Sequence, residues 1–99
     1  MLFKNFPKEE IYSLTDQIRR NSRSTNINII EAYRKRKYTN HFVSKLTDAD
    51  KENSETQGWL EFAKACCYIG DDEFMRLNSK CLETGRLIVF MIRNPEKFS

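Results

Sequence analysis

The sequence predicts an all-α fold, an antiparallel up-and-down bundle of three long helices, and two observations carry this prediction. The 99 residues include only 3 Gly and 2 Pro, and Pro7 and Pro95 stand near the two ends, so the chain between them is free of strong helix breakers. Three successive segments carry apolar residues at helical spacing. Because a chain of this length fits one domain, we expect residues 1–99 to form a single helical-bundle domain.

The first predicted helix begins at Pro7, whose fixed φ suits the first helical position, and Glu9 and Glu10 complement the positive end of its dipole. Its inward stripe, at spacings of 3 and 4, comprises Ile11, Leu14, Ile18, Ser22, Thr25, Ile29 and Ala32. The polar segment 21–28 has low helix propensity and favours a kink or a frayed turn. The apolar pattern resumes after it, so we expect one helix.

The second predicted helix follows a turn at Tyr38, and Thr39 is its expected N-cap because a threonine hydroxyl accepts a hydrogen bond from a free amide of the first turn. Its inward seam alternates spacings of 4 and 3, as in a heptad repeat, and comprises Phe42, Leu46, Ala49, Asn53, Thr56, Leu60, Ala63 and Cys67. A second apolar group lies beside the seam and comprises Trp59, Phe62, Cys66 and Ile69. Gly70 is the expected stop of this helix.

The third predicted helix begins with the acids Asp71 to Glu73 and ends at Asn94, because Pro95 disfavours helical geometry in the residue before it. Its inward seam comprises Phe74, Leu77, Cys81, Thr84, Ile88 and Met91. A flanking set comprises Met75, Leu82, Gly85, Val89 and Ile92. Three helices cannot cover two doubled stripes among themselves, so a fourth helix is missing or another chain supplies it. We therefore predict a homo-oligomer.

The side chains that usually carry catalysis are sparse, and we predict no enzyme, no cofactor and no metal site. His41 is the single histidine and has no Glu three residues before it, as a di-metal bundle would need. The three cysteines, at 66, 67 and 81, lack the CxxC spacing of zinc sites, and we expect reduced thiols. Glu52 and Glu55 lie one turn apart, as a carboxylate pair would, but a solvated helix face is the favoured interpretation.

Two polar residues, Asn53 and Thr56, interrupt the apolar seam of the second predicted helix. Buried polar groups need hydrogen bonds, so these residues either fix the register of the bundle or form a small polar site at its middle. No apolar run reaches the roughly 18 residues of a membrane span, and the N-terminus is too short and polar for a signal peptide. We expect a cytoplasmic protein with no membrane contact.

Basic residues concentrate between positions 19 and 37, where Glu31 is the one acid. The seven are Arg19, Arg20, Arg23, Arg34, Lys35, Arg36 and Lys37. Cations neutralise phosphates, and the flanking Tyr33 and Tyr38 offer rings on which unpaired bases can stack. Helices also end in Lys and Arg because these stabilise the negative end of the dipole, so nucleic-acid binding and plain helix termination both stay open.

Two segments resemble the signature of a known family. Residues 14–20 read LTDQIRR and residues 24–33 read STNINIIEAY, and further matches are Phe42, Leu46, the pair 55–56, Leu60 and the pair 68–69. This order is similar to the four-helix-bundle proteins encoded in intervening sequences of bacterial 23S rRNA genes. Asn26 stands where that family usually has Pro, and Ala32 where it has Gly.

The resemblance implies a four-helix bundle that here lacks most of its first helix, of which only Met1 to Asn5 represents the end. It also implies a homo-oligomer, a pentameric ring, with a basic surface. A related branch serves as the accessory protein of diversity-generating retroelements, where nucleic acid and a reverse transcriptase are the expected partners.

Two hypotheses of different class follow. The leading one is a non-enzymatic, homo-oligomeric scaffold that binds RNA or DNA nonspecifically through the seven basic residues. The alternative is a protein-interaction module whose apolar groove on the second and third predicted helices accepts a helix from a partner protein. An enzyme is the least favoured class.

Overall fold

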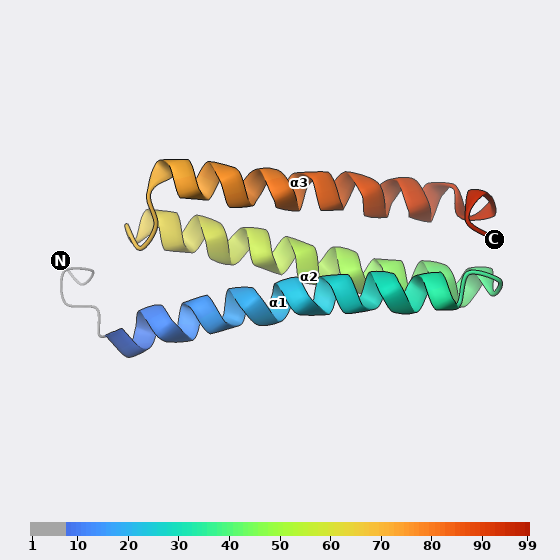
Figure 1. Ribbon diagram of the computed structural model, residues 1–99, viewed down its shortest axis with the longest axis horizontal. Coiled ribbons are helices and arrows are strands. Elements are labelled where there is room, and N and C mark those ends of the chain that lie inside the picture. The colour runs from blue at the N-terminus through green and yellow to red at the C-terminus, as the bar shows by residue number, and fades with distance from the viewer. Residues whose placement is uncertain (1–7) are drawn as a thin grey trace.

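The computed structural model describes residues 8–99, and these residues form three long helices and one short one. The elements are α1 (Lys8–Arg34), α2 (Thr39–Ala65), α3 (Asp71–Arg93) and the 3₁₀ helix η2 (Pro95–Lys97). The three long helices run antiparallel in chain order and are joined by two short turns (Figure 1). The described residues contain no strand, so the predicted all-α up-and-down bundle of three long helices is confirmed.

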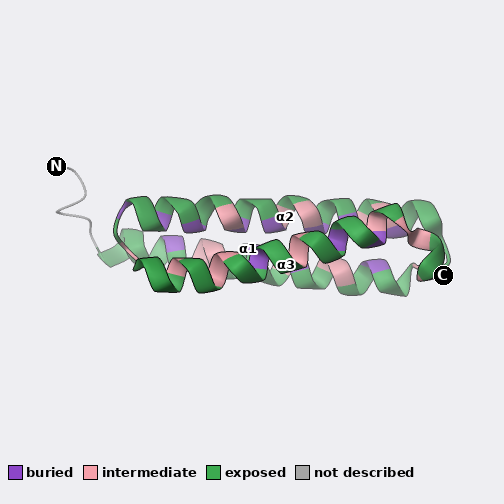
Figure 2. Ribbon diagram, turned by 90° about the horizontal axis from the view of Figure 1, so that it is seen from above, coloured by how far each residue is buried: buried purple, intermediate pink, exposed green. Residues whose placement is uncertain are grey.

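The middle of the fold is α2, because α1 and α3 each pack along it and make little contact with each other. In Figure 2 both α1 and α3 lie on the same side of α2, which leaves an open groove between them with α2 as its floor. We call this surface the groove; among the residues that line it are Ile18, Thr25, Ile29 and Tyr33 of α1 and Leu77, Thr84, Leu87 and Met91 of α3.

Several residues of the predicted apolar stripes are not buried in the core. On α1, Ile11 is 40% exposed and Ile18 and Ile29 are half-buried, because the described residues cover the groove side of this helix only in part. The second stripes of α2 and α3 also stay open, with Trp59, Phe62 and Met75 exposed. The expectation of apolar surface that three helices cannot cover is confirmed.

The polar middle of α1 is held in the helix by hydrogen bonds to α2. Asn21 is buried, and its side-chain nitrogen donates to Glu52 Oε1 and Glu55 Oε1, both at 2.9 Å. Its side-chain oxygen accepts a bond from Gln17 Nε2 at 3.0 Å. Every hydrogen-bonding group of this buried amide is therefore occupied, and α1 continues through segment 21–28 as the single helix predicted.

A second buried amide joins α2 to α3. Asn53 Nδ2 donates to the backbone oxygen of Cys81 at 2.9 Å. Gly85 makes room for this contact, since a Cβ there would lie 3.3 Å from Asn53 Nδ2. The Thr56 hydroxyl bonds within its own helix and donates to the backbone oxygen of Glu52 at 3.0 Å. The Asn53 bond fixes one axial position of α3 against α2.

Two predicted helix boundaries are wrong. The N-cap of α2 is Tyr38, with extended backbone angles and no capping bond from its side chain, so Thr39 is the first helical residue. The α2 helix stops at Ala65, before Gly70, because Cys67 adopts a left-handed φ of 62°. The amides of Cys67 and Tyr68 bond back to the oxygens of Lys64 and Ala63, which closes a Schellman motif.

Gly70 instead takes the N-cap position of α3, with φ −79° and ψ 169°. At the other end of α3, the helix stops at Arg93 before Asn94 and Pro95, as predicted. Two predictions lie outside the described residues. They are the start of the first helix at Pro7 and the assignment of Met1 to Asn5 to the end of the family's first helix. In residues 8–99 no helix is both long and apolar enough to span a membrane.

The main core lies in one half of the bundle, beside the α1–α2 turn. Its buried members are Ala32, Phe42, Leu46, Ala49, Ile88 and Met91. The C-terminal residues fold onto this cluster, where the Phe98 ring packs against Phe42 and Phe90 at centroid distances of 5.9 and 6.1 Å. The chain end is thereby fixed beside the start of α2.

Candidate nucleic-acid interface

The α1–α2 turn carries four of the seven predicted basic residues. Backbone bonds from Lys35 to Ala32 (2.9 Å) and from Tyr38 to Lys35 (2.9 Å) fold residues 34–38 tightly. Arg36 serves the turn itself, since its guanidinium lies 4.2 Å from the centre of the Tyr33 ring and donates to the Tyr33 oxygen at 3.0 Å. The other three, at 34, 35 and 37, are exposed and make no ion pair within residues 8–99.

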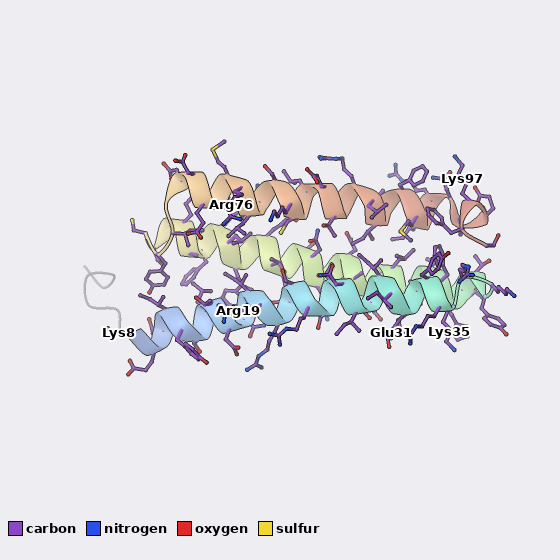
Figure 3. All side chains as sticks on the ribbon, viewed as in Figure 1. Lys8, Arg19, Glu31, Lys35, Arg76 and Lys97 are labelled. Atoms are coloured by element: carbon purple, nitrogen blue, oxygen red, sulfur yellow. The ribbon has the colours of Figure 1, made fainter. Side chains whose placement is uncertain are left out.

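Two further basic residues join the turn from the C-terminal segment, and sequence reasoning missed both. The antiparallel fold returns the end of α3 to the α1–α2 turn, so Arg93 and Lys97 lie at the same end as Lys35 (Figure 3). Lys97 is held by its contact with the Phe90 ring, 5.2 Å from Nζ to the ring centre. The predicted up-and-down topology could have revealed these two residues, because it places the C-terminus of the third helix at the same end as the turn between the first two.

We call this surface the basic end; its cations are Arg34, Lys35, Arg36, Lys37, Arg93 and Lys97. Two acids, Glu31 and Glu96, lie near these cations. Glu31 is already paired with Lys45, with 3.3 Å between Nζ and Oε1, so only Glu96 of these two is left to offset the positive charge. Two tyrosine rings border the cations, Tyr33 at 50% and Tyr38 at 64% exposure. The arrangement combines positive charge with flat aromatic faces, as phosphate contact and base stacking require.

The remaining three predicted residues, Arg19, Arg20 and Arg23, form a separate group on the middle of α1. The 11 residues between Arg23 and Arg34 span about 16 Å along the helix axis. Arg20 is paired with Asp16, with Nη2 to Oδ2 at 2.8 Å, so it is partly neutralised. The seven predicted residues therefore fall into two clusters, and only the cluster in the α1–α2 turn lies at the same end of the bundle as the C-terminal segment.

The opposite end of the bundle carries the opposite charge. The N-termini of α1 and α3 both lie there, and each begins with acids. We call this surface the acidic end; its carboxylates are Glu9, Glu10, Asp71, Asp72 and Glu73. The two ends of the described bundle, whose long axis measures 52 Å, therefore carry opposite charge.

The groups considered for chemistry lie apart. His41 is exposed at the basic end, where its ring meets Tyr38 edge-on at 6.2 Å. Cys66 and Cys67 lie at the far end of α2, and Cys81 lies in α3. Burial raises the pKa of the Cys66 and Cys81 thiols above the ordinary cysteine value. No group of three metal-binding side chains occurs in residues 8–99.

The family described as 23S rRNA-intervening sequence protein matches residues 1–89. No curated protein and no solved structure matches the chain. The family match spans α1, α2 and most of α3, so it includes the α1–α2 turn that forms most of the basic end. The chain therefore belongs to the family of 23S rRNA-intervening sequence proteins.

Proposed function

We propose that this protein binds RNA or DNA through its basic end and catalyses no reaction. The observation that carries the proposal is the convergence of the α1–α2 turn with Arg93 and Lys97 on one end of the bundle. These two residues are distant from the turn in sequence, so termination of α1 alone does not account for the basic residues at this end of the bundle. A packed core supports the whole surface.

The ligand that fits this surface is a single strand, bound with little sequence preference. All the cations of the basic end except Arg36 are exposed, and their long side chains suit phosphate contacts, which carry no sequence information directly. Tyr38 is the more available stacking ring, because Arg36 already covers one face of Tyr33. Stacking tolerates every base, since every base has a π face.

The test is a fluorescence titration against a short single-stranded RNA at several salt concentrations. For single strands, log K should fall with log salt with a slope of about −0.7 per phosphate contact. Replacing Arg34, Lys35, Arg36 and Lys37 by Gln should weaken binding and make this slope shallower. Replacing Arg93 and Lys97 by Gln should have the same effect in smaller measure, which the sequence alone did not predict.

Matched controls separate this surface from net charge. A variant with Lys8, Lys51, Lys80 and Arg86 replaced by Gln loses the same charge at exposed sites that make no ion pair within residues 8–99. It should keep the wild-type slope. A further variant neutralises Arg19, Arg20 and Arg23 and measures the cluster in the middle of α1 alone. Equal losses in the turn variant and in its matched control would attribute binding to overall charge, and no binding at low salt would refute the proposal.

We propose also that copies of the chain associate, because the described residues leave apolar side chains of all three helices exposed. The family resemblance favours a ring of five subunits. Light scattering measures the mass directly. A monomer at every concentration would contradict association, and a mass other than five subunits would contradict the ring.

A second candidate function is favoured by the groove, which is open along α1 and α3. Its two ends are apolar, and its middle carries Thr25, Asn53 and Thr84, so it suits a partner's amphipathic helix with a polar residue at mid-length. Helical peptides selected against the wild type and counter-selected against Leu87→Glu would identify groove binders. This candidate predicts peptides that need Leu87 and predicts no affinity for RNA.

A further inference from the structure

The basic cluster in the middle of α1 borders the groove. Arg19 stands seven residues before Asn26, and Arg23 stands seven residues before Ile30. Residues seven apart lie two turns apart on one helix face, and Asn26 and Ile30 both line the groove. Arg19 and Arg23 are exposed and make no ion pair within residues 8–99. The α1 margin of the groove therefore carries two positive charges that the basic end does not use.

The opposite margin, on α3, adds a third cation. Lys80 lines the groove, is exposed and makes no ion pair in the described part of the chain. Arg76, one turn earlier, is engaged by Glu73, with 3.7 Å between Nη2 and Oε2. Glu83, one turn after Lys80, offsets one positive charge. We call Arg19, Arg23 and Lys80 the groove cations, and they leave the middle of the groove positive.

The walls between the groove cations offer hydrogen-bond acceptors. Asn53 and Thr84 line the groove at this level. Asn53 is 5% exposed, and its Nδ2 donates to the Cys81 oxygen at 2.9 Å. Its Oδ1 accepts no hydrogen bond, and the Thr84 hydroxyl makes none, within residues 8–99. A buried acceptor favours an occupant that brings a donor to it.

We propose that the groove binds an acidic amphipathic helix of another protein, which has carboxylates on both margins of its apolar stripe and a carboxamide at mid-length. This inference rests on the second candidate function, binding of a partner helix in the groove. The carboxylates pair with the groove cations, and the carboxamide donates to Asn53 Oδ1. The apolar residues of the helix contact Ile18 and Leu77 on one side of this level and Ile29 and Leu87 on the other.

The charges and the apolar walls select this occupant over two others. A nucleic-acid strand would place its charged backbone against the apolar walls, at a cost in desolvation. A second copy of the chain fits less well, because the exposed apolar residues of α1 and α3 lie among arginines, such as Arg23 and Arg86, that the groove cations repel. The exposed apolar residues of α2 are Trp59 and Phe62, which occupy one turn and not the length of the groove.

Selection from a library of helical peptides tests the chemistry of the occupant. Each peptide has about 21 residues, or three heptads, with a fixed leucine stripe, Asn or Leu at its middle, and Glu, Gln or Lys at the margins. Selection against the wild type should enrich Glu at the margins and Asn at the middle. Peptides that need Leu87 but show no preference for Glu would overturn the acidic occupant and leave helix binding standing. Failure to select any peptide would overturn both.

Charge reversal on the protein checks which residues set the preference. Fluorescence anisotropy compares a selected Glu peptide with its Lys counterpart. The wild type should bind the Glu peptide about tenfold more tightly, since several exposed charge pairs change sign together, and Arg19→Glu combined with Lys80→Glu should reverse the preference. The matched control, Lys51→Glu combined with Arg86→Glu, makes the same change at exposed sites outside the groove and should keep the wild-type preference. Equal effects of the two variants would overturn the proposal.

The two other occupants give results of their own. Displacement of the Glu peptide by a short single-stranded RNA, with weaker RNA binding in the Arg19→Glu, Lys80→Glu variant, would make the groove a nucleic-acid site. A changed mass of the self-associated protein in that variant would make the occupant another copy of the chain. Either result overturns the proposal. Loss of RNA binding at the basic end alters neither peptide measurement, so that proposal and this one fail separately.

Discussion

The two ends of the bundle differ in packing as well as in charge. At the basic end, Phe42, Leu46 and Ile88 are fully buried, and Phe98 covers the start of α2. At the acidic end, Trp59 and Phe62 form an edge-on pair at 6.1 Å that stays 38% and 45% exposed. Three of the four largest fully buried side chains therefore lie in the half next to the basic end, although Leu87 and Phe90 stay exposed there as Trp59 and Phe62 do at the acidic end.

This difference matters for binding, because a charged surface recognises a ligand better when its support does not move. The basic end combines cations from two segments, and its geometry depends on the contact of Phe98 with Phe42 and Phe90. A rigid support lowers the ordering cost that binding incurs. The acidic end has exposed aromatic rings, and such a composition is typical of a protein-interaction surface.

The largest expected effect comes from truncating a ring at each end. Phe42→Ala should lower the free energy of unfolding by about 3–5 kcal/mol, since the side chain is fully buried in the core cluster. Trp59→Ala should cost only about 1–2 kcal/mol, because the indole is already 38% exposed. Urea unfolding followed by circular dichroism measures both. Equal losses would contradict the difference in packing between the ends.

Between the two ends, Asn21 links α1 to α2 through its side-chain hydrogen bonds. Replacing it should have the next largest effect on the free energy of unfolding. Asn21→Ala leaves Glu52 and Glu55 without their shared donor, and we expect a loss of about 1–3 kcal/mol. The matched control is Asn28→Ala in the same polar segment, whose amide bonds only to the Ser24 oxygen of its own helix. The control should lose less; a larger loss there would place the α1–α2 link elsewhere.

The helices and their inward seams were predictable, because periodicity reports local geometry directly. The seam of α2 held from Phe42 to Ala63, since a central helix is surrounded and its apolar positions are all used. On α1 the same pattern overstated burial, and Ile11 is exposed because its neighbour is absent from the described residues. A single sequence gives the direction of a stripe but not what covers it.

The candidate site was half predictable for a related reason. Lys35 and Lys37 were found because they lie in one basic run of the sequence, while Arg93 and Lys97 are brought to the same end of the bundle only by the fold. Cys67 illustrates a different limit. Its left-handed φ ends α2, and this conformation favours Gly so strongly that Gly70 was the natural prediction.

That conformation predicts a stabilising substitution at the acidic end. Cys67→Gly should raise the free energy of unfolding by about 1 kcal/mol, because glycine adopts φ of 62° without the steric cost of a Cβ. Cys67→Ser keeps the Cβ and should give no gain. A similar gain in both variants would mean that the thiol, and not the backbone angle, limits stability. Thermal unfolding of the two variants beside the wild type decides this.

The smallest expected effect concerns the pH dependence of stability at the acidic end. Burial, followed by the nearby Cys67 and Glu10, raises the pKa of the Cys66 thiol above its ordinary value. The folded state therefore keeps this proton at a pH where the unfolded chain has released it. Its contribution to stability is present below the ordinary cysteine pKa, about 8.5, and is lost as the pH rises through the folded pKa.

Urea unfolding of the wild type and of Cys66→Ala at pH 7 and at pH 10 isolates this contribution. Both proteins lose stability at pH 10 through other groups, the buried Cys81 thiol among them, but the wild type should lose more, because only it carries the Cys66 thiol. Glu10→Gln should reduce the difference, since its carboxylate is one of the charges that raise the Cys66 pKa. Identical pH dependence in wild type and Cys66→Ala would mean that the acidic end leaves the thiol in contact with water. The contrast in packing between the two ends would then extend to the residues that close α2.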